Sequence, residues 1–383
     1  MPRPVRILHA HSTFNLGGKE ARAVRLMNAF GKAAEHVVLS AQPDQLSARA
    51  ALEPGIAVAF PADAPPLAGP PLPGRLWRLA RYARGFDLIL TYNWGAFDMV
   101  MARRLFGGVA RLPPLVHHED GFNQDEVEAL NPRRNLYRRI GLPAARRLIV
   151  PSQRLAGLAR TAWHQPPQRI ERIANGIAVS RYSAPAEREL LALDGERGEI
   201  VIGTVAGLRP VKNLPRLVRA FAGMKTPNAR LVIVGEGPEH DRIAAEAQAL
   251  GVASRVDLPG FRAEPWRWIG GFDIFALSSD SEQFPISLVE AMAAGLPAVT
   301  TAVGDIADMV ATGNRPFLVA PGDEAGFSAA LDALAERPDL RHAIGCANRA
   351  KAATEYEEGA MIARYARLYG EAIGRPRALS DGA

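Results

Sequence analysis

Two carboxylates at a fixed spacing are the residues of this chain best suited to chemistry. Glu282 and Glu290 lie eight positions apart, and the second falls in a short apolar stretch that predicts a helix. Pro285 suits the first helical position, and the Gly-Leu-Pro run that starts at Gly295 ends the helix. The backbone N–H groups after Pro285 would lack acceptors and could bind a diphosphate. Glu290, about one and a half turns into the helix, could then accept hydrogen bonds from a sugar diol.

The run from Glu282 to Pro297 resembles the donor-site signature of the family 4 retaining glycosyltransferases, which have the GT-B fold. That signature is two Glu residues separated by seven others, followed by Ala-Met-Ala-x-Gly-x-Pro, and Glu282 and Glu290 match its two acids. The resemblance implies that Glu290 binds the donor ribose and that Glu282 contacts the donor sugar or its phosphate side. Gln283 stands where a Gly is common, which adds bulk beside the sugar pocket.

A lysine follows the strand predicted at residues 200–205. Lys212 is one of five lysines among 46 basic residues. A flexible ammonium group at a strand end can neutralise a diphosphate as the glycosidic bond breaks. The resemblance makes it the phosphate-binding lysine of the family. Many relatives carry an arginine where this chain has Gly207, and Arg209 could supply the second positive charge instead.

Two further loops resemble parts of the family's donor site. Gly17 and Gly18 follow the first predicted strand and open a helix. Paired glycines let the backbone approach a ligand and leave helix N–H groups free for an anion. They match the family's Gly-Gly-x-Glu loop, which lines the cleft between the domains. By the same resemblance, the backbone near Phe261 and Arg262 would meet the donor base.

A run of polar residues ends the strand predicted at residues 114–118. If the strand persists, alternation places His118 and Asp120 on one side, and His117 and Glu119 on the other. The adjacent histidines therefore cannot easily share a metal, and we expect neither a metal site nor a cofactor. Relatives have a His directly before a Gly here, facing the reacting sugar, whereas this chain has Asp120 before Gly121. Either His118 or Asp120 could fill that role.

Size and composition allow two domains. The 383 residues carry a formal net charge of +6, and 48% of them are hydrophobic. No apolar run reaches the roughly 18–20 residues needed to span a bilayer, and the N-terminus has no signal-peptide core, so we expect a cytoplasmic protein. The single cysteine, Cys346, excludes an internal disulfide, and its Ala-rich helical surroundings predict a buried, inert thiol.

Two basic segments in the N-terminal half suit an anionic membrane surface. Arg75, Arg78 and Arg81 fall on one side of a predicted helix, and a second basic cluster with aromatic content spans residues 133–139. Such segments bind anionic lipids. We therefore expect this half to dock peripherally on the inner face of the cytoplasmic membrane and reach a lipid-linked acceptor. The basic residues are scattered rather than banded, so we expect no nucleic-acid partner.

Strand-like runs alternate with helical stretches along the chain, and these elements must position the site. The runs form two sets, at residues 5–9, 36–40, 87–92, 114–118 and 147–151, and at residues 200–205, 230–234, 255–258, 273–277, 298–301 and 317–319. Continuous apolar strands separated by helices predict an α/β chain with parallel sheets covered on both faces.

Two such sets predict two Rossmann-like domains. We expect an acceptor-binding domain at residues 1–180 and a nucleotide-sugar-binding domain at residues 181–360. Residues 42–74 are predicted to be an irregular loop, and residues 180–198 the connection between the domains. The resemblance implies a GT-B arrangement, with sheets facing across a cleft and a C-terminal helix in residues 361–383 that packs back on the first domain.

Together these features predict a metal-independent retaining glycosyltransferase that moves a sugar from a nucleotide diphosphate sugar to a hydroxyl of a saccharide or lipid-linked acceptor. Polysaccharide, lipopolysaccharide and glycolipid synthesis all fit by family analogy. A nucleotide-sugar epimerase of the same fold is an alternative, and so is an inactive nucleotide-sugar-binding relative. We expect the catalytic residues to be His118, Asp120, Lys212 and Glu282. We expect the donor-binding residues to be Gly17, Gly18, Arg209, Lys212, Phe261, Arg262, Glu282, Pro285, Ile286, Ser287 and Glu290.

Overall fold

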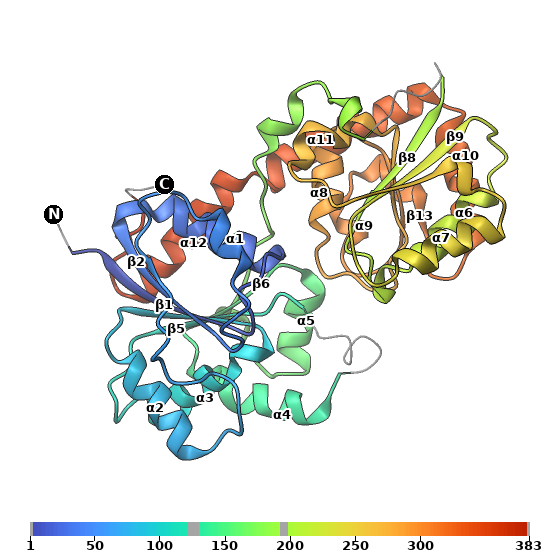
Figure 1. Ribbon diagram of the computed structural model, residues 1–383. Coiled ribbons are helices and arrows are strands. Elements are labelled where there is room, and N and C mark those ends of the chain that lie inside the picture. The colour runs from blue at the N-terminus through green and yellow to red at the C-terminus, as the bar shows by residue number, and fades with distance from the viewer. Residues whose placement is uncertain (1–2, 122–129, 192–197, 381–383) are drawn as a thin grey trace. The chain divides into compact units, whose positions relative to one another are not determined.

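The computed structural model describes residues 3–121, 130–191 and 198–380. The chain divides into two compact units: unit 1 comprises residues 1–175 and 359–383, and unit 2 comprises residues 176–358. Each unit is built around a parallel β-sheet with helices (Figure 1). The predicted α/β class with two parallel sheets is therefore confirmed.

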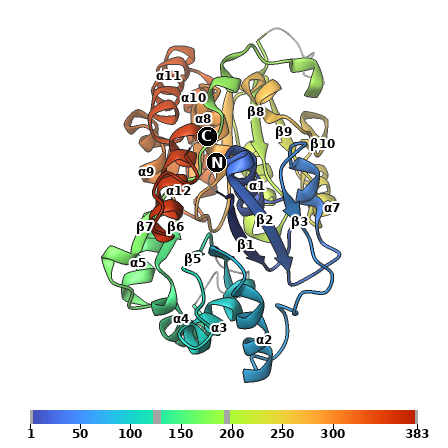
Figure 2. The ribbon, with the colours of Figure 1, turned by 90° about the vertical axis from the view of Figure 1, so that its left-hand side faces the viewer.

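Unit 1 contains a seven-stranded parallel sheet. Its strands are β1 (Val5–His11), β2 (Ala34–Ser40), β3 (Val58–Ala59), β4 (Leu88–Tyr92), β5 (Leu115–His118), β6 (Arg147–Val150) and β7 (Ile170–Arg172). Their order in the sheet is β3-β2-β1-β4-β5-β6-β7, and Figure 2 shows β1, β2 and β3 beside one another. The direction of winding reverses between β1 and β4, and α/β sheets bind ligands at the carboxyl ends of strands at such a point.

Helices cover both faces of this sheet. They are α1 (Gly18–Phe30), α2 (Pro73–Ala83), α3 (Phe97–Phe106), α4 (Pro132–Gly141), α5 (Gln153–Thr161) and α12 (Glu358–Ala372). On one face α2, α3 and α5 share a core with Leu8 and Ile89, and on the other α1 and α12 share a core with Ile7 and Leu88. Consecutive strand residues thus supply opposite faces, as the pleat requires.

Unit 2 contains a six-stranded parallel sheet, ordered β10-β9-β8-β11-β12-β13. Its strands are β8 (Ile200–Val205), β9 (Ala229–Val234), β10 (Val256–Gly260), β11 (Ile274–Leu277), β12 (Ala298–Thr301) and β13 (Leu318–Val319). Its helices are α6 (Leu214–Ala222), α7 (His240–Ala249), α8 (Ile286–Ala293), α9 (Ile306–Met309), α10 (Glu324–Ala335) and α11 (Pro338–Glu355). Helix α8 packs against α11 and is followed by Gly295, whose φ of 79° is left-handed and suits glycine.

The eleven strand runs expected from the sequence are all present, five in unit 1 and six in unit 2, with ends shifted by at most two residues. Strands β3 and β7 were not predicted, because two or three residues are too few to show a pattern. The predicted loop at residues 42–74 also contains a 3₁₀ turn, Ser47–Ala51, and the start of α2. In the predicted connection, residues 192–197 lie outside the described residues.

Two arginines that we expected on basic surface segments are buried instead. Arg75 is 7% exposed, donates to four backbone carbonyls between residues 66 and 70, and pairs with Asp98. Arg138 is 0% exposed and lies 3.2 Å from Glu119. A buried guanidinium needs such acceptors, so both positions were wrongly assigned to a lipid-facing surface. Within the described ranges, no helix combines the length and apolar character needed to cross a bilayer.

The prediction of a buried thiol was also wrong. Cys346 lies on α11 but is exposed, with its Sγ 3.5 Å from Nε2 of His342 one turn earlier. The buried positions of this helix are Ile344, Gly345, Asn348 and Ala352. The Ala-rich sequence predicted the helix but not which of its faces meets the core.

Five of the described histidines are buried in unit 1, namely His117 and four whose rings lie near or on the opposite face of the sheet. His9, His11, His36 and His118 are each at most 2% exposed. Nε2 of His9 lies 3.0 Å from Nδ1 of His36, and the ring of His11 stacks on Tyr92 with the centroids 4.0 Å apart. Burial lowers the pKa of all four, to about 4 for His36 and about 3 for His118. All four are therefore neutral in the folded protein at pH 7.

We predict that His11→Phe makes the fold less sensitive to acid. Below about pH 6.5 an unfolded histidine binds a proton that the folded one does not, so the free energy of unfolding falls as the pH drops further. Neither ring nitrogen of His11 has a hydrogen-bond partner among the described residues. A phenyl ring therefore removes the proton uptake without breaking a bond. Between pH 7 and pH 5 the variant should lose about 2 kcal/mol less stability than the wild type in urea unfolding.

His164→Asn provides the control in the same unit. His164 is exposed, and its φ of 53° is one that asparagine tolerates. This variant should keep the wild-type pH dependence. If His11→Phe kept it as well, the buried neutral state of His11 would be refuted.

Candidate active site

The start of helix α8 presents unpaired backbone donors. The helix begins at Ile286, Pro285 occupies the N-cap, and no side chain caps this end. The sequence predicted Pro285 as the first helical residue, and the shift of one position leaves the N–H groups of Ile286 and Ser287 without intrahelical acceptors. The aligned peptide dipoles add partial positive charge at the same place. This helix start is therefore suited to an anion.

Lys212 and Glu282 meet although 70 positions separate them in the chain. Nζ of Lys212 lies 2.5 Å from Oε1 of Glu282, which also accepts a hydrogen bond from Oγ of Ser279 at 2.6 Å. The two charged side chains are 15% and 8% exposed. Oγ of Ser278 donates to the carbonyl of Lys212 at 3.0 Å and so ties the lysine loop to the end of β11. These contacts fix an ammonium group beside the loop that leads into α8.

Glu290 is held by a tyrosine that the sequence analysis did not single out. The hydroxyl of Tyr182 donates to Oε1 of Glu290 at 3.1 Å. Tyr182 is 6% exposed and lies in the 3₁₀ turn Val179–Ser183, which packs against α8. This hydrogen bond orients the carboxylate of Glu290. The sequence around Tyr182 was predicted to be a connection and gives no signal of this contact.

Arg209 lies beside Gly207. A Cβ atom built at Gly207 would be 3.6 Å from Nε of Arg209. Arg209 is exposed, and within residues 3–121, 130–191 and 198–380 no carboxylate pairs with it. Its guanidinium therefore adjoins the position at which the resembled family carries an arginine.

The carboxyl end of β10 exposes an aromatic ring. Phe261 is 60% exposed, and its backbone N–H donates to Oε1 of Glu236 at 3.4 Å. Arg262 donates from Nη1 to the carbonyl of Phe261 at 3.1 Å. The strands of this sheet are parallel, so the loops that follow them lie at one edge. That edge carries Lys212 after β8, Phe261 after β10, and Glu282 with the start of α8 after β11.

The two candidates for the sugar-facing residue are both engaged inside unit 1. Nδ1–H of His118 donates to the carbonyl of Thr91 at 3.1 Å, and its Nε2 accepts from the hydroxyl of Tyr369 at 2.7 Å. Asp120 accepts two hydrogen bonds from Arg22, one of them 2.8 Å long. Burial would raise the pKa of Asp120, but Arg22 holds it below its usual range, so Asp120 is ionised. His118 is fully buried with both nitrogens bonded, whereas the side chain of Asp120 is 13% exposed.

The alternation predicted after β5 is confirmed. His118 and Asp120 contact α12 and α1, whereas His117 contacts Thr91 at 2.8 Å and Glu119 pairs with α4. The two adjacent histidines thus face opposite sides. In the described ranges, 3–121, 130–191 and 198–380, no group of three or more His, Cys, Asp or Glu residues could hold a metal ion.

The start of α1, at the glycine pair, is less suited to an anion than the start of α8. Gly17 and Gly18 are exposed, and no side chain caps this helix. However, Oε2 of Glu20 lies 3.0 Å from where a Cβ of Gly17 would be, and Glu20 pairs with Lys19. A phosphate at this helix start would meet the carboxylate of Glu20, which weighs against a role of the pair in binding the donor phosphates.

Two family models match this chain. The model described as glycosyl transferases group 1 matches residues 192–351, which lie in unit 2. The model described as glycosyltransferase family 4 matches residues 16–181, most of which lie in unit 1. The two matches do not overlap, and together they include every site residue predicted from the sequence, whereas Tyr182 falls between them.

Several curated relatives are named as glycosyltransferases. The chain is 27% identical over 210 residues to the N-acetyl-alpha-D-glucosaminyl L-malate synthase of Bacillus anthracis. The aligned region covers 54% of each chain. It is 28% identical over 344 residues to the D-inositol 3-phosphate glycosyltransferase of Kribbella flavida, covering 82% of this chain and 80% of the relative. For the relatives from Bacillus anthracis, Bacillus subtilis and Mycobacterium marinum, the chain spans about half of their length.

Solved structures agree on the architecture. The crystal structure of Anabaena HepE in complex with UDP superposes with a TM-score of 0.78 at 22% identity, covering 96% of this chain and all of that chain. WaaG, a glycosyltransferase involved in lipopolysaccharide biosynthesis, superposes with a TM-score of 0.70 at 19% identity. This likeness shows the GT-B fold. The two family matches, which together span most of the chain, show that it belongs to the family 4 glycosyltransferases.

Proposed function

We propose that this chain transfers a sugar, with retention of configuration, from a nucleoside diphosphate sugar to a hydroxyl of a saccharide or lipid-linked acceptor in the synthesis of cell-surface polysaccharide, lipopolysaccharide or glycolipid. The observation that carries the proposal is the edge of unit 2 at which Lys212, Glu282, Glu290 and the start of α8 come together. Related solved structures contain UDP or UDP-glucose, which supports a uridine nucleotide as the first donor to try.

The donor is proposed to lie along this edge. Lys212 and the N–H groups of Ile286 and Ser287 bind its two phosphates, and Glu290, oriented by Tyr182, accepts hydrogen bonds from the ribose. By family resemblance, Phe261 and Arg262 are proposed to meet the base. Glu282 holds the ammonium group of Lys212 and so positions it toward the phosphates.

The reaction then needs stabilisation of the leaving group. When the bond from the anomeric carbon to the phosphate oxygen breaks, its electron pair stays on the diphosphate, and negative charge grows there. Fixed cationic and N–H donors stabilise this charge more strongly than that of the intact donor, which lowers the barrier. The acceptor oxygen forms the new bond on the same face of the sugar, and its proton passes to the departing phosphate. We propose that cationic side chains, without a metal ion, supply the positive charge.

In unit 1, Asp120 is proposed as the residue that faces the reacting sugar. It is ionised and partly exposed, whereas His118 is enclosed. Arg22 donates to both oxygens of Asp120 and fixes its orientation. His118, bonded to Thr91 and Tyr369, acts as a positioning residue in the layer behind it.

Two substitutions test the donor site. Lys212→Ala should lower kcat by about a hundredfold, because the leaving diphosphate loses its ammonium partner. Glu290→Ala should raise the KM for donor by about tenfold, because hydrogen bonds to the ribose are made equally before and during reaction. The donor is first chosen from a panel of nucleotide sugars by thermal stabilisation. The rate of UDP release is then measured, without acceptor to reveal any isomerised donor and with candidate acceptors to detect transfer.

Lys225→Ala and Glu336→Ala are the matched controls, since both residues are exposed in unit 2. Both should retain wild-type kinetics. Wild-type rates in Lys212→Ala, or an unchanged KM in Glu290→Ala, would remove that residue from the mechanism. Conversion of donor to its isomer in place of transfer would identify an epimerase.

Arg209 is proposed to replace the arginine that relatives carry at position 207. Arg209→Ala should therefore reduce kcat/KM by about tenfold, as expected for the loss of a charge-assisted contact to phosphate. Adding Gly207→Arg to that variant should restore most of the loss, since Gly207 is not in the left-handed region and a Cβ there meets no atom closer than 3.6 Å. Arg337→Ala, at an exposed position, serves as the control. No rescue by Gly207→Arg would show that the two positions do not serve the same phosphate.

We further propose that unit 1 docks on an anionic membrane through a face that we call the α3–α4 face. It comprises Leu105 and Val109, at and after the end of α3, and Leu136 and Ile140 of α4, which are 45–81% exposed. Nε of Arg104 donates to the carbonyl of Ile140 at 3.1 Å, so the two helices adjoin. Exposed apolar side chains among arginines suit the interface of an anionic bilayer.

The double substitution Leu136→Glu with Ile140→Glu should abolish flotation with phosphatidylglycerol vesicles, because it replaces apolar contact with repulsion. Leu250→Glu, at an exposed leucine of unit 2, should not change flotation. A wild-type protein that stays unbound at moderate salt, or a double variant that floats normally, would contradict docking through this face.

A further inference from the structure

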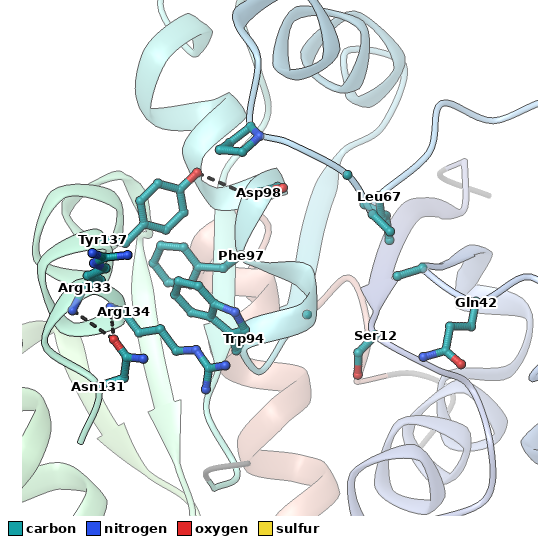
Figure 3. A pocket seen from close by; sticks show the side chains of 15 residues that line it. Ser12, Gln42, Leu67, Trp94, Phe97, Asp98, Asn131, Arg133, Arg134 and Tyr137 are labelled. Atoms are coloured by element: carbon teal, nitrogen blue, oxygen red, sulfur yellow. Dashed lines mark hydrogen bonds between the residues drawn. The ribbon is translucent and has the colours of Figure 1, made fainter. Parts of the chain in front are cut away.

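A second site that the donor chemistry does not use lies in unit 1. A cavity of about 580 Å³ opens beside Ser12 after β1, Gln42 after β2, and Trp94 after β4 (Figure 3). These loops follow the carboxyl ends of strands at the point where the winding of the sheet reverses. Parallel sheets bind ligands at that point. The volume is in the range of small-molecule pockets.

One wall of the cavity is aromatic. The ring centroids of Trp94 and Phe97 are 5.7 Å apart. The ring centroid of Tyr137 lies 5.6 Å from each of them. Figure 3 shows these rings on one side and Leu67, Gln42 and Ser12 across from them. Such a wall suits a ligand ring with apolar faces, as a pyranose or a phenyl ring has.

A fixed carboxylate also lines the cavity. Asp98 pairs with the buried Arg75 and accepts a hydrogen bond from the hydroxyl of Tyr137 at 3.1 Å. Burial, and then the charge of Asp98, raise the pKa of Tyr137, which keeps its proton on the hydroxyl. The side chain of Asp98 remains 21% exposed. Its remaining lone pairs can accept hydrogen bonds from ligand hydroxyls.

Positive charge enters the cavity from the start of α4. Asn131 caps this helix by accepting from the N–H groups of Arg133 and Arg134. The guanidinium of Arg134 lies 5.4 Å over the ring of Trp94. Arg133 is exposed, lines the cavity, and has no ion-pair partner within residues 3–121, 130–191 and 198–380. A guanidinium in this state can take a carboxylate or phosphate with two hydrogen bonds.

We propose that this cavity binds the acceptor and that the acceptor is a saccharide with an acidic group. Arg133 pairs with the acid, Asp98 accepts from ring hydroxyls, and the aromatic wall contacts the apolar face of the ring. A carboxylate and a phosphate monoester present the same chemistry to Arg133. The identification as acceptor rests on the proposed transferase function, whereas the binding of an acidic glycoside does not.

Matched probes test this inference. 4-Nitrophenyl β-D-glucuronide and 4-nitrophenyl β-D-glucoside differ only in the group at C6, and the 6-phosphate of the glucoside adds the second acid. We expect isothermal titration of the full chain to give a Kd at least about tenfold lower for an acidic probe than for the glucoside. The better of the two acids identifies whether the natural group is a carboxylate or a phosphate.

Two variants that each replace an arginine with a glutamate test whether the acidic probe binds in this cavity. Arg133→Glu should abolish the preference for the acidic probe. Arg81→Glu, at an exposed position on α2, should retain it. Arg133→Lys should recover part of the preference, since it keeps the charge but loses the bidentate geometry. Thermal stabilisation of Arg133→Glu by UDP should equal that of the wild type, which shows that this variant is folded and that its donor site is intact.

The outcomes separate this inference from the proposed function. Equal binding of acidic and neutral probes, no binding of either acid, or a preference that survives in Arg133→Glu overturns the acidic-acceptor site. If no nucleotide sugar of the panel stabilises the wild type while the acidic preference is intact, the transferase assignment is overturned instead, and a binding site for acidic glycosides remains.

Discussion

The contact between Lys212 and Glu282 is the constraint on which the candidate donor site depends. Both charges are largely withdrawn from water, and removing either partner leaves an uncompensated buried charge, which is strongly destabilising. The pair alone is nearly neutral toward a phosphate. Net attraction for an anion must therefore come from what adjoins it, namely the uncapped start of α8 and the exposed guanidinium of Arg209. The ion pair fixes the ammonium group of Lys212 in position, and the helix start and the arginine add to the positive potential around it.

In unit 1 many polar residues are buried between the sheet and its helices, whereas those of the candidate donor site lie at the edge of a sheet. His118 and the ion pair of Arg22 with Asp120 lie under α1 and α12, and the neighbouring histidines are held neutral by burial. Neutral imidazoles in a core can accept as well as donate hydrogen bonds, so they link strands to helices without the desolvation penalty of a charge. Apart from the partly exposed Asp120, the groups proposed to face a ligand in this unit lie in loops on the other face of the sheet, around Trp94 and Asp98. The same sheet thus carries a largely buried polar layer on one face and an open cavity on the other.

Strand periodicity and the signature around Glu282 predicted more of this structure than helix faces did. Eleven strands were predicted from apolar runs, because a parallel strand is buried on both faces and is apolar along its length. Such a strand can be recognised without knowing which residues pack against it. To predict which face of a helix is buried, one must know what packs against it. Arg75 and Arg138 look like surface charges in a helical projection, and only the fold shows that Asp98 and Glu119 lie opposite them. Tyr182 was missed for the same reason, since its contact with Glu290 spans 108 positions of the chain.

On the proposed function, position 207 departs from the family pattern while the chemistry of the site is kept. A phosphate responds to where a guanidinium lies and not to which position of the loop supplies it, because Coulomb attraction and bidentate geometry depend on distance and direction alone. With glycine at 207, no side chain occupies the space there, and Arg209 lies within 3.6 Å of it. On the proposed function, Arg209 supplies from two positions further along the charge that relatives supply from position 207, and the glycine leaves the space beside its side chain open.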